Sequence, residues 1–243
     1  MAAAASRGPD AAKRAAASRA LAYVKDGMTV GLGSGSTAEL FLAALADRVR
    51  DGLRIRGVPT SERVAELARA AAIPLVGAED LPRIDVTVDG ADEVDPWFNM
   101  IKGRGGALLR EKLVAMASTA RIMVIDDSKL VTSLGERQAV PVNIVRFGWR
   151  QTAARVELLG CRATLRHAGD GEPFVTDDNL YVLDCRFDPI AQPARLADAI
   201  KGVLGVVEHG LFIGVASGVI VGGADGARVL ERPGVPGAPG VMV

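Results

Sequence analysis

The sequence has 243 residues and 49% of them are hydrophobic, which suits one large domain, or one domain with a small companion, around a sizeable core. Lys plus Arg and Asp plus Glu number 29 each, and this balance excludes the general attraction to nucleic acid or anionic membranes that a basic surface produces. No apolar run approaches the roughly 18 residues that a membrane span needs. The two Cys and two His form no ligand pattern, so we expect no zinc site and no metal.

Helix-like and strand-like segments alternate in the first half of the chain. The expected helices cover residues 11–25, 37–50, 61–72 and 108–118. The expected strands cover residues 28–32, 53–58, 84–88 and 121–125. Ser61 is a suitable N-cap for the third helix. This alternation predicts an α/β fold, a Rossmann-like parallel sheet with helices on its faces.

The pattern changes after about Leu134. Strand-like segments at 140–146, 162–167, 180–186 and 206–208 alternate with helix-like segments at 149–159 and 193–204. The order strand, helix, strand, strand, helix, strand predicts a second, smaller α+β domain of the split βαβ kind. Short strands at 211–215, 219–222 and 227–230 are expected to return to the first domain.

A glycine-rich segment, GLGSGST at 31–37, lies between a predicted strand and a predicted helix. Glycines let the backbone approach a ligand, and the free N–H groups at a helix start favour an anion. Ser34, Ser36 and Thr37 add hydroxyl donors, so a phosphate is the natural occupant, and a tight turn with a Ser or Thr cap is the structural alternative. The segment lacks the Lys of a Walker A loop and the spacing of the dinucleotide fingerprint, which favours a sugar phosphate over a nucleotide.

An acidic segment, VDGADEVD at 88–95, follows the strand at 84–88. It carries four carboxylates, at Asp89, Asp92, Glu93 and Asp95. Two of them in a partly buried cleft could bind sugar hydroxyls or exchange protons. An acidic surface turn is the alternative, and the spacing does not match a calcium-binding EF-hand loop.

A second glycine run, IKGRGGALLREK at 101–112, opens the helix at 108–118 with Lys102 on the entering side. A cation there favours developing negative charge. Glu111 lies one turn inside the helix and could point towards a cleft. From the residues alone an exposed ion pair is the favoured interpretation, because Arg110 and Lys112 flank it.

The segment IDDSK at 125–129 follows another strand, and Lys129 could reach a ligand there or be an ordinary surface lysine. Polar motifs thus follow several different strands of the predicted sheet. Ligands of parallel sheets bind beyond the carboxyl ends of the strands. We therefore expect these loops to converge on one pocket.

Taken in order, the stretches GLGSGSTA, VDGADEVD, IKGRGGALLREK and IDDSK resemble ribose-5-phosphate isomerase of type A, over about residues 13–230. The resemblance implies an aldose–ketose isomerase that interconverts D-ribose 5-phosphate and D-ribulose 5-phosphate in the pentose phosphate pathway, without a cofactor. It implies a Rossmann-like catalytic domain and a small α+β domain, which the pattern of segments places at 1–134 plus 211–232 and at 135–210. The Pro- and Gly-rich residues 233–243 are expected to form a flexible tail. It also implies a homodimer or homotetramer, while the two isolated cysteines, Cys161 and Cys185, favour a cytoplasmic protein with reduced thiols.

By the same resemblance Glu111 is the catalytic base, and Asp89, Asp92 and Lys102 assist it. The implied substrate-binding residues are Lys13, Ser34, Gly35, Ser36, Thr37, Asp89, Gly90, Ala91, Asp92, Lys102, Gly103, Arg104, Gly105 and Lys129. Some members of the family carry Thr in place of Ser34 and Gly in place of Arg104, which leaves the role of the Arg104 side chain open.

Other functions remain as alternatives to this isomerase. A sugar-phosphate deaminase or lactonase on a related fold would release ammonia or hydrolyse a lactone. A non-catalytic effector-binding module usually adds a DNA-binding helix-turn-helix, and only about one helix precedes the first strand here. A nicotinamide oxidoreductase is disfavoured by the loop spacing.

Overall fold

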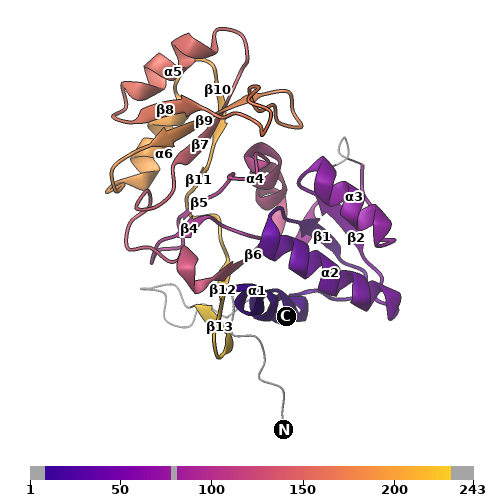
Figure 1. Cartoon of the computed structure of the whole chain (residues 1–243). Helices are drawn as coiled ribbons and strands as arrows, with labels where there is room; N and C mark the ends of the chain where they lie inside the picture. Colours follow the sequence, from indigo (N-terminus) through magenta and orange to yellow (C-terminus); the bar gives the residue numbers. More distant parts are fainter. Residues whose placement is uncertain (1–8, 78–80, 231–243) are drawn as a thin grey trace. The chain divides into compact units, whose positions relative to one another are not determined.

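The computed structural model describes residues 9–77 and 81–230, so the predicted tail at 233–243 and most of the N-terminal arm lie outside the described residues. The chain divides into two compact units (Figure 1). The first unit comprises Met1–Gly90, Val114–Lys129 and Ala216–Val243, and the second comprises Ala91–Leu113 and Leu130–Val215. The domain boundaries expected near residues 134 and 211 stay a prediction.

The first unit is built on a six-stranded sheet with the order β13-β12-β6-β3-β1-β2. Its strands are β1 (Thr29–Leu32), β2 (Arg56–Pro59), β3 (Ile84–Asp89), β6 (Ser118–Asp126), β12 (Gly218–Gly223) and β13 (Gly226–Leu230). Neighbouring strands are parallel except for the β12–β13 hairpin. The predicted α/β class with a parallel sheet is therefore confirmed.

The order in which the chain adds strands to the sheet reverses at β1. The chain runs from β1 through α2 (Ser36–Arg50) to β2 on one side, and through α3 (Glu62–Ala70) to β3 on the other side of β1. The crevice between β1 and β3 is thus the topological switch point, where α/β sheets bind their ligands. The loops after β1 and β3 carry the glycine-rich and acidic motifs.

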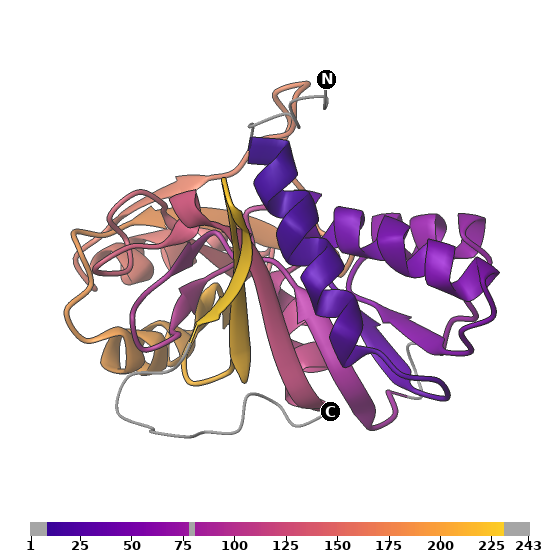
Figure 2. The same cartoon turned by 90° about the horizontal axis from the view of Figure 1, so that it is seen from below.

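Local sequence signals explain how the helices of this unit begin and pack. Ser61 is the N-cap of α3, and its hydroxyl accepts a hydrogen bond from the Val64 amide at 3.2 Å. Helix α1 (Pro9–Ala20) lies against β12 (Figure 2). The approach is close, because a Cβ on Gly222 would lie 1.8 Å from the carbonyl oxygen of Ala12.

The second unit contains a four-stranded antiparallel sheet with the order β10-β7-β9-β8. Its elements are β7 (Val140–Ile144), α5 (Trp149–Glu157), β8 (Arg162–Leu165), β9 (Tyr181–Arg186), α6 (Pro193–Lys201) and β10 (Val206–His209). The order of these elements along the chain and the order of the strands in the sheet are those of the predicted split βαβ arrangement. Apolar residues of the strands and of both helices form one core, which includes Val142, Val156, Leu183 and Ile200.

A three-stranded sheet in the second unit was not predicted. It joins β4 (Glu93–Val94), β5 (Met100–Ile101) and β11 (Leu211–Phe212) in the order β11-β5-β4. The expectation that the strand at 211–215 returns to the first domain's sheet is wrong, because β11 pairs with β5. Strands of two residues are too short to show the alternation from which strands are predicted.

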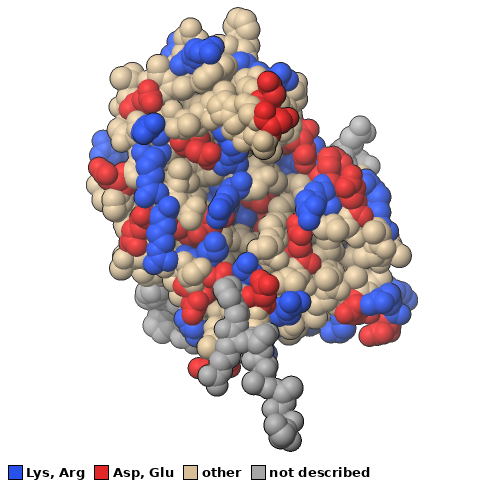
Figure 3. Space-filling view, in the orientation of Figure 1, with Lys and Arg blue, Asp and Glu red and all other residues tan. Residues whose placement is uncertain are grey.

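Positive and negative side chains alternate on the face seen in Figure 3 without a broad area of one sign. Within residues 9–77 and 81–230, no helix has the length and apolar character that crossing a bilayer demands.

Candidate active site

In the first unit, the loop after β1 lies against the end of β3 at the switch point. The Asp89 carboxylate is buried, and its Oδ1 accepts hydrogen bonds from the amides of Ser34 at 3.1 Å and Gly90 at 2.7 Å. Gly33 permits this approach, because a Cβ there would lie 2.3 Å from the same oxygen. Asp89 and the glycine-rich loop therefore form one rigid corner, as the sequence led us to expect.

The Ser34 hydroxyl is engaged within the protein. It lies 2.7 Å from the Thr60 hydroxyl and 3.2 Å from that of Ser61, both at the end of β2. Sequence reasoning did not assign Thr60 to the site and gave Ser61 only a capping role, although hydroxyls that follow a neighbouring parallel strand are a usable signal. The donors that face outwards are therefore the first amides of α2 and the exposed hydroxyl of Ser36.

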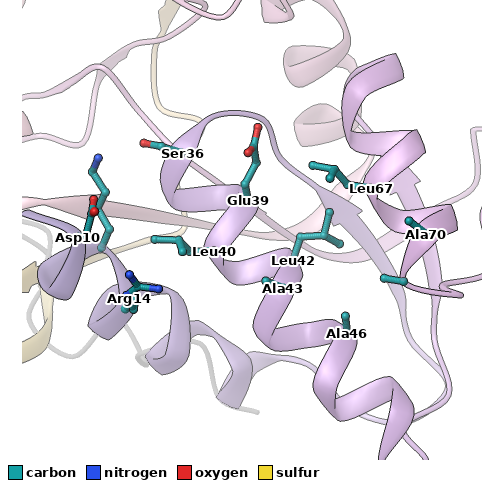
Figure 4. Close-up of a pocket in the computed structure, with 12 residues that line it drawn as sticks. Asp10, Arg14, Ser36, Glu39, Leu40, Leu42, Ala43, Ala46, Leu67 and Ala70 are labelled. Atoms are coloured by element: carbon teal, nitrogen blue, oxygen red, sulfur yellow. The ribbon is translucent and has the colours of Figure 1, made fainter.

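A cavity of about 570 Å3 lies beside the start of α2 (Figure 4). Asp10, Lys13 and Arg14 of α1 line it together with Ser36, and apolar residues of α2 and α3 line it as well. Glu39 also lines it, but its carboxylate is bonded to Arg63 at 2.8 Å, which lowers its pKa. A cation and a helix start at one cavity suit an anionic group such as a phosphate.

Lys129 is the last residue of η3 (Asp127–Lys129), a 3-10 helix of one turn that follows β6. The turn is held by Asp126, whose Oδ1 accepts a hydrogen bond from the Ser128 amide at 3.0 Å. β6 is the parallel neighbour of β3, so Lys129 and Asp89 follow the carboxyl ends of adjacent strands. No ion pair of Lys129 is found within the described residues.

In the second unit, Glu111 is buried on α4 (Leu108–Met116) and forms an ion pair with Lys102, with 3.2 Å between Oε2 and Nζ. Their exposed fractions are only 4% and 3%. The interpretation of Glu111 as part of an exposed ion pair is therefore wrong. A buried carboxylate beside a buried ammonium is typical of a proton-transfer site.

The two charged neighbours of Glu111 have partners of their own. Arg110 donates to Asp178 at 2.8 Å, and Lys112 donates to Glu208 at 2.7 Å. Lys112 also donates to the carbonyl oxygens of His209 and Leu211, at 2.8 and 3.1 Å. These bonds anchor both flanks of Glu111 and leave Lys102 as its ion-pair partner.

The Lys112 cluster has shifted pKa values. Burial lowers the pKa of Lys112, and the bond to Glu208 offsets part of that effect. Burial raises the pKa of Glu208, but the hydrogen bonds from Lys112, Lys201 and the His209 amide outweigh it and bring the value to about 2. Burial and the charge of Lys112 lower the pKa of His209 to about 4.

The Phe212 ring of β11 contacts the ammonium groups of both Lys102 and Lys112. Its ring centroid lies 5.5 Å from the Lys102 Nζ and 4.7 Å from the Lys112 Nζ. The ring is 1% exposed, so both cation–π contacts lie in a water-excluded region, where such contacts are strongest. Sequence reasoning gave Phe212 no role of its own, because a single aromatic in a short strand has the appearance of core.

The glycine loop before α4 is shaped by its own bonds. The Arg104 amide donates to Asp92 Oδ2 at 3.0 Å, and the Lys102 amide donates to the Gly210 carbonyl at 2.9 Å. The Arg104 side chain is exposed, whereas Lys102 and Gly103 are buried. These hydrogen bonds place Asp92 beside the loop at Arg104 and hold the loop at Lys102 against Gly210.

The acidic motif divides by role. Glu93 accepts hydrogen bonds from the amides of Gly135, Arg137 and Gln138 at 2.6 to 2.7 Å. Asp95 accepts bonds from the amide of Asn99 and from its side chain. These two carboxylates stabilise loops.

Comparison with known proteins decides the family. The family model described as Ribose 5-phosphate isomerase A (phosphoriboisomerase A) matches residues 56–226. The chain belongs to this family. The ribose-5-phosphate isomerase A of Synechococcus sp. (strain JA-3-3Ab) is 53% identical over 225 residues, which cover 92% of this chain and 98% of the relative. That of Thermomicrobium roseum (strain ATCC 27502 / DSM 5159 / P-2) is 51% identical over 93% of this chain and 95% of the relative.

Solved structures of the ribose-5-phosphate isomerase family share the fold. One D-ribose-5-phosphate isomerase, in complex with phospho-erythronic acid, has a TM-score of 0.89 and 35% identity and covers 93% of this chain and 100% of its own. The Plasmodium falciparum enzyme has a TM-score of 0.88 and 38% identity, over 92% of this chain and 99% of its own. The predicted family, fold class and isomerase assignment are therefore confirmed.

Proposed function

We propose that this chain interconverts D-ribose 5-phosphate and D-ribulose 5-phosphate, with Glu111 as the base that moves the proton. The observation that carries the proposal is the buried ion pair between Glu111 and Lys102 beside the glycine loop. Membership of the isomerase family supports the substrate class. So does the phosphorylated acid in the complex with a relative.

In the forward direction the Glu111 carboxylate takes the proton from C2 of the open-chain aldose. The electron pair of the C2–H bond forms the C1–C2 double bond, and the former carbonyl oxygen at C1 becomes an enediolate oxygen. Glu111 then returns the proton to C1, while the proton of the C2 hydroxyl moves to the C1 oxygen, so that C1 carries the hydroxyl and C2 becomes the ketone. Lys102 and amides of the glycine loop stabilise the negative charge on the oxygens.

The remaining residues hold the substrate. Lys13, Ser36 and the first amides of α2 suit the phosphate, which is remote from the reacting carbons and fixes their position. Asp89 and Asp92 are proposed to accept bonds from sugar hydroxyls and to move protons between them. Lys129 is proposed to contact the substrate as well.

Replacement of Glu111 by Gln tests the proposal, because it keeps the shape of the side chain and removes the base. Incubated with ribose 5-phosphate and no added metal, the wild type should form ketopentose phosphate, and in D2O this product should carry deuterium at C1. Glu111→Gln should lower kcat by about 10²- to 10⁴-fold and still bind the sugar phosphate. The control Glu172→Gln changes an exposed glutamate and should be fully active.

Near-normal turnover in Glu111→Gln would refute the assignment of the base. Release of ammonia or hydrolysis of a lactone, without isomerisation, would instead indicate the related sugar-phosphate enzymes. Binding of ribose 5-phosphate without turnover by the wild type would indicate an effector-binding module. A cytoplasmic location and a homodimer or homotetramer belong to the same proposal, on the resemblance to the family.

A further inference from the structure

Arg166, directly after β8, binds the glycine loop from the side of the four-stranded sheet. Its Nη1 donates to the carbonyl oxygens of Gly103 at 3.2 Å and Arg104 at 2.9 Å. Its Nε donates to Asp184 of β9 at 2.9 Å, and its Nη2 bonds the second oxygen of the same carboxylate. One planar guanidinium thus joins two successive loop carbonyls to a fixed carboxylate.

The orientation of these carbonyls fixes the amides on the other side of the loop. In a trans peptide the N–H points opposite to the C=O. The peptide that turns the Gly103 carbonyl to Arg166 turns the Arg104 N–H to Asp92, as observed. The next peptide turns the Arg104 carbonyl to Arg166 and the Gly105 N–H away from it. That N–H has no hydrogen-bond partner among the residues that the structure describes.

The loop would not keep this arrangement by itself. Gly103 and Gly106 have φ values of 102° and 89°, and glycine moves between such conformations at little cost. The β8–β9 connection adds a second contact, because the Phe174 ring lies 2.6 Å from where a Cβ on Gly106 would be. Arg166 and Phe174 also contact each other, with 5.9 Å between the guanidinium carbon and the ring centroid.

We propose that Arg166, held by Asp184, is a positioning residue that aims the Gly105 amide at an oxygen of the sugar phosphate. This inference rests on the proposed isomerase function. The amide would donate to the oxygen that gains negative charge when Glu111 takes the proton. An amide fixed before the reaction stabilises that charge without the energy of reorganisation. The Arg166 side chain contacts Asp184, the Phe174 ring and the glycine loop, so we place its effect on the reaction in the loop.

The site is open to a small reagent. Arg166 and Asp184 line a cavity of about 440 Å3 together with Asp92 and Arg104. The Arg166 side chain is 15% exposed, so removal of the side chain should leave a space that a guanidinium ion can enter. This access makes chemical rescue a direct test.

Arg166→Ala should lower kcat for ribose 5-phosphate by roughly 10- to 100-fold, because the glycine loop would no longer hold the Gly105 amide in position to donate to the substrate. KM should change far less, since the residues proposed to hold the phosphate are untouched. Millimolar methylguanidinium should restore a substantial part of kcat, and methylammonium should not. The control Arg162→Ala removes an exposed arginine at the start of β8, the strand that precedes Arg166, and should leave kcat unchanged.

Arg166→Lys keeps the charge but cannot bond two carbonyls and a carboxylate together, so it should retain the fold and show a lowered kcat. Arg166→Lys therefore provides the kinetic test if Arg166→Ala does not fold. The inference is overturned if kcat of either folded variant stays within about twofold of wild type, if the whole loss lies in KM, or if methylguanidinium rescues nothing. A wild type without isomerase activity would instead sink the proposed function, which Glu111→Gln tests separately.

Discussion

His209 should make the stability of the protein depend on pH near neutrality. The side chain is 5% exposed, and its Nδ1 accepts a hydrogen bond from the Leu211 amide at 3.2 Å. Protonation of Nδ1 would break that bond and place a second positive charge beside Lys112. Burial and the charge of Lys112 accordingly lower the pKa of His209 from 6.5 to about 4.

The sign and size of the effect follow from proton linkage. Between the two pKa values the unfolded chain binds more protons than the folded chain, so the free energy of unfolding falls as the pH falls through this window. The full difference of pKa corresponds to about 3 kcal/mol. From about pH 7 to about pH 5 the loss should be about 2 kcal/mol. Glu208 contributes at lower pH. Its pKa is lowered from 4.5 to about 2, so its contribution to the free energy of unfolding is lost as the pH falls from about 4.5 to about 2.

Urea unfolding of the wild type and of His209→Gln, from about pH 7 to about pH 5, measures this contribution. The Gln side chain can still accept a bond from the Leu211 amide but does not titrate, so the variant should lack about 2 kcal/mol of the pH-dependent loss. His167→Gln removes the other histidine of the sequence, which lies exposed, and should keep the wild-type pH dependence. An equal loss of stability in His209→Gln and in the wild type would refute the reasoning.

Two further substitutions test the packing of the two units. Gly222→Ala should lower the free energy of unfolding by about 1–3 kcal/mol, because its Cβ would meet the Ala12 carbonyl and displace α1. Gly223→Ala is its control in urea unfolding: nothing lies closer than 3.9 Å to the new Cβ, and equal losses in the two variants would contradict the explanation. Phe212→Leu should cost about 1–2 kcal/mol of stability and lower kcat, because both lysines lose the ring; unchanged kinetics and stability would show that the cation–π contacts contribute nothing.

The elements that the sequence predicted well are those set by local signals. The Ser61 cap, the apolar strands and the alternation of helices and strands all lie within short windows, so the parallel sheet and the split βαβ arrangement could be predicted. β4 and β5 could not, because two residues show no period and their pairing depends on β11, about 110 residues later along the chain.

The orientation of Glu111 was beyond local reasoning for a different reason. Arg110, Glu111 and Lys112 are consecutive on a helix, so they point in three directions about 100° apart. Two of their partners, Asp178 and Glu208, lie 68 and 96 residues away in sequence. Flanking opposite charges therefore indicated an exposed pair, whereas distant carboxylates remove both flanking charges from Glu111.

The glycines explain why the resemblance to the family was visible when the charges were ambiguous. A charged residue can take many partners, so Glu93 and Asp95 could not be separated from Asp89 and Asp92 by type. A glycine at a close approach has no substitute: a Cβ on Gly33 would strike Asp89, and one on Gly210 would lie 2.2 Å from the Lys102 carbonyl. Each of these glycines contacts a residue proposed to act on the substrate. The spacing of the glycines therefore indicates where the backbone must lie close to the residues proposed to act on the substrate, and the spacing of the charged residues does not.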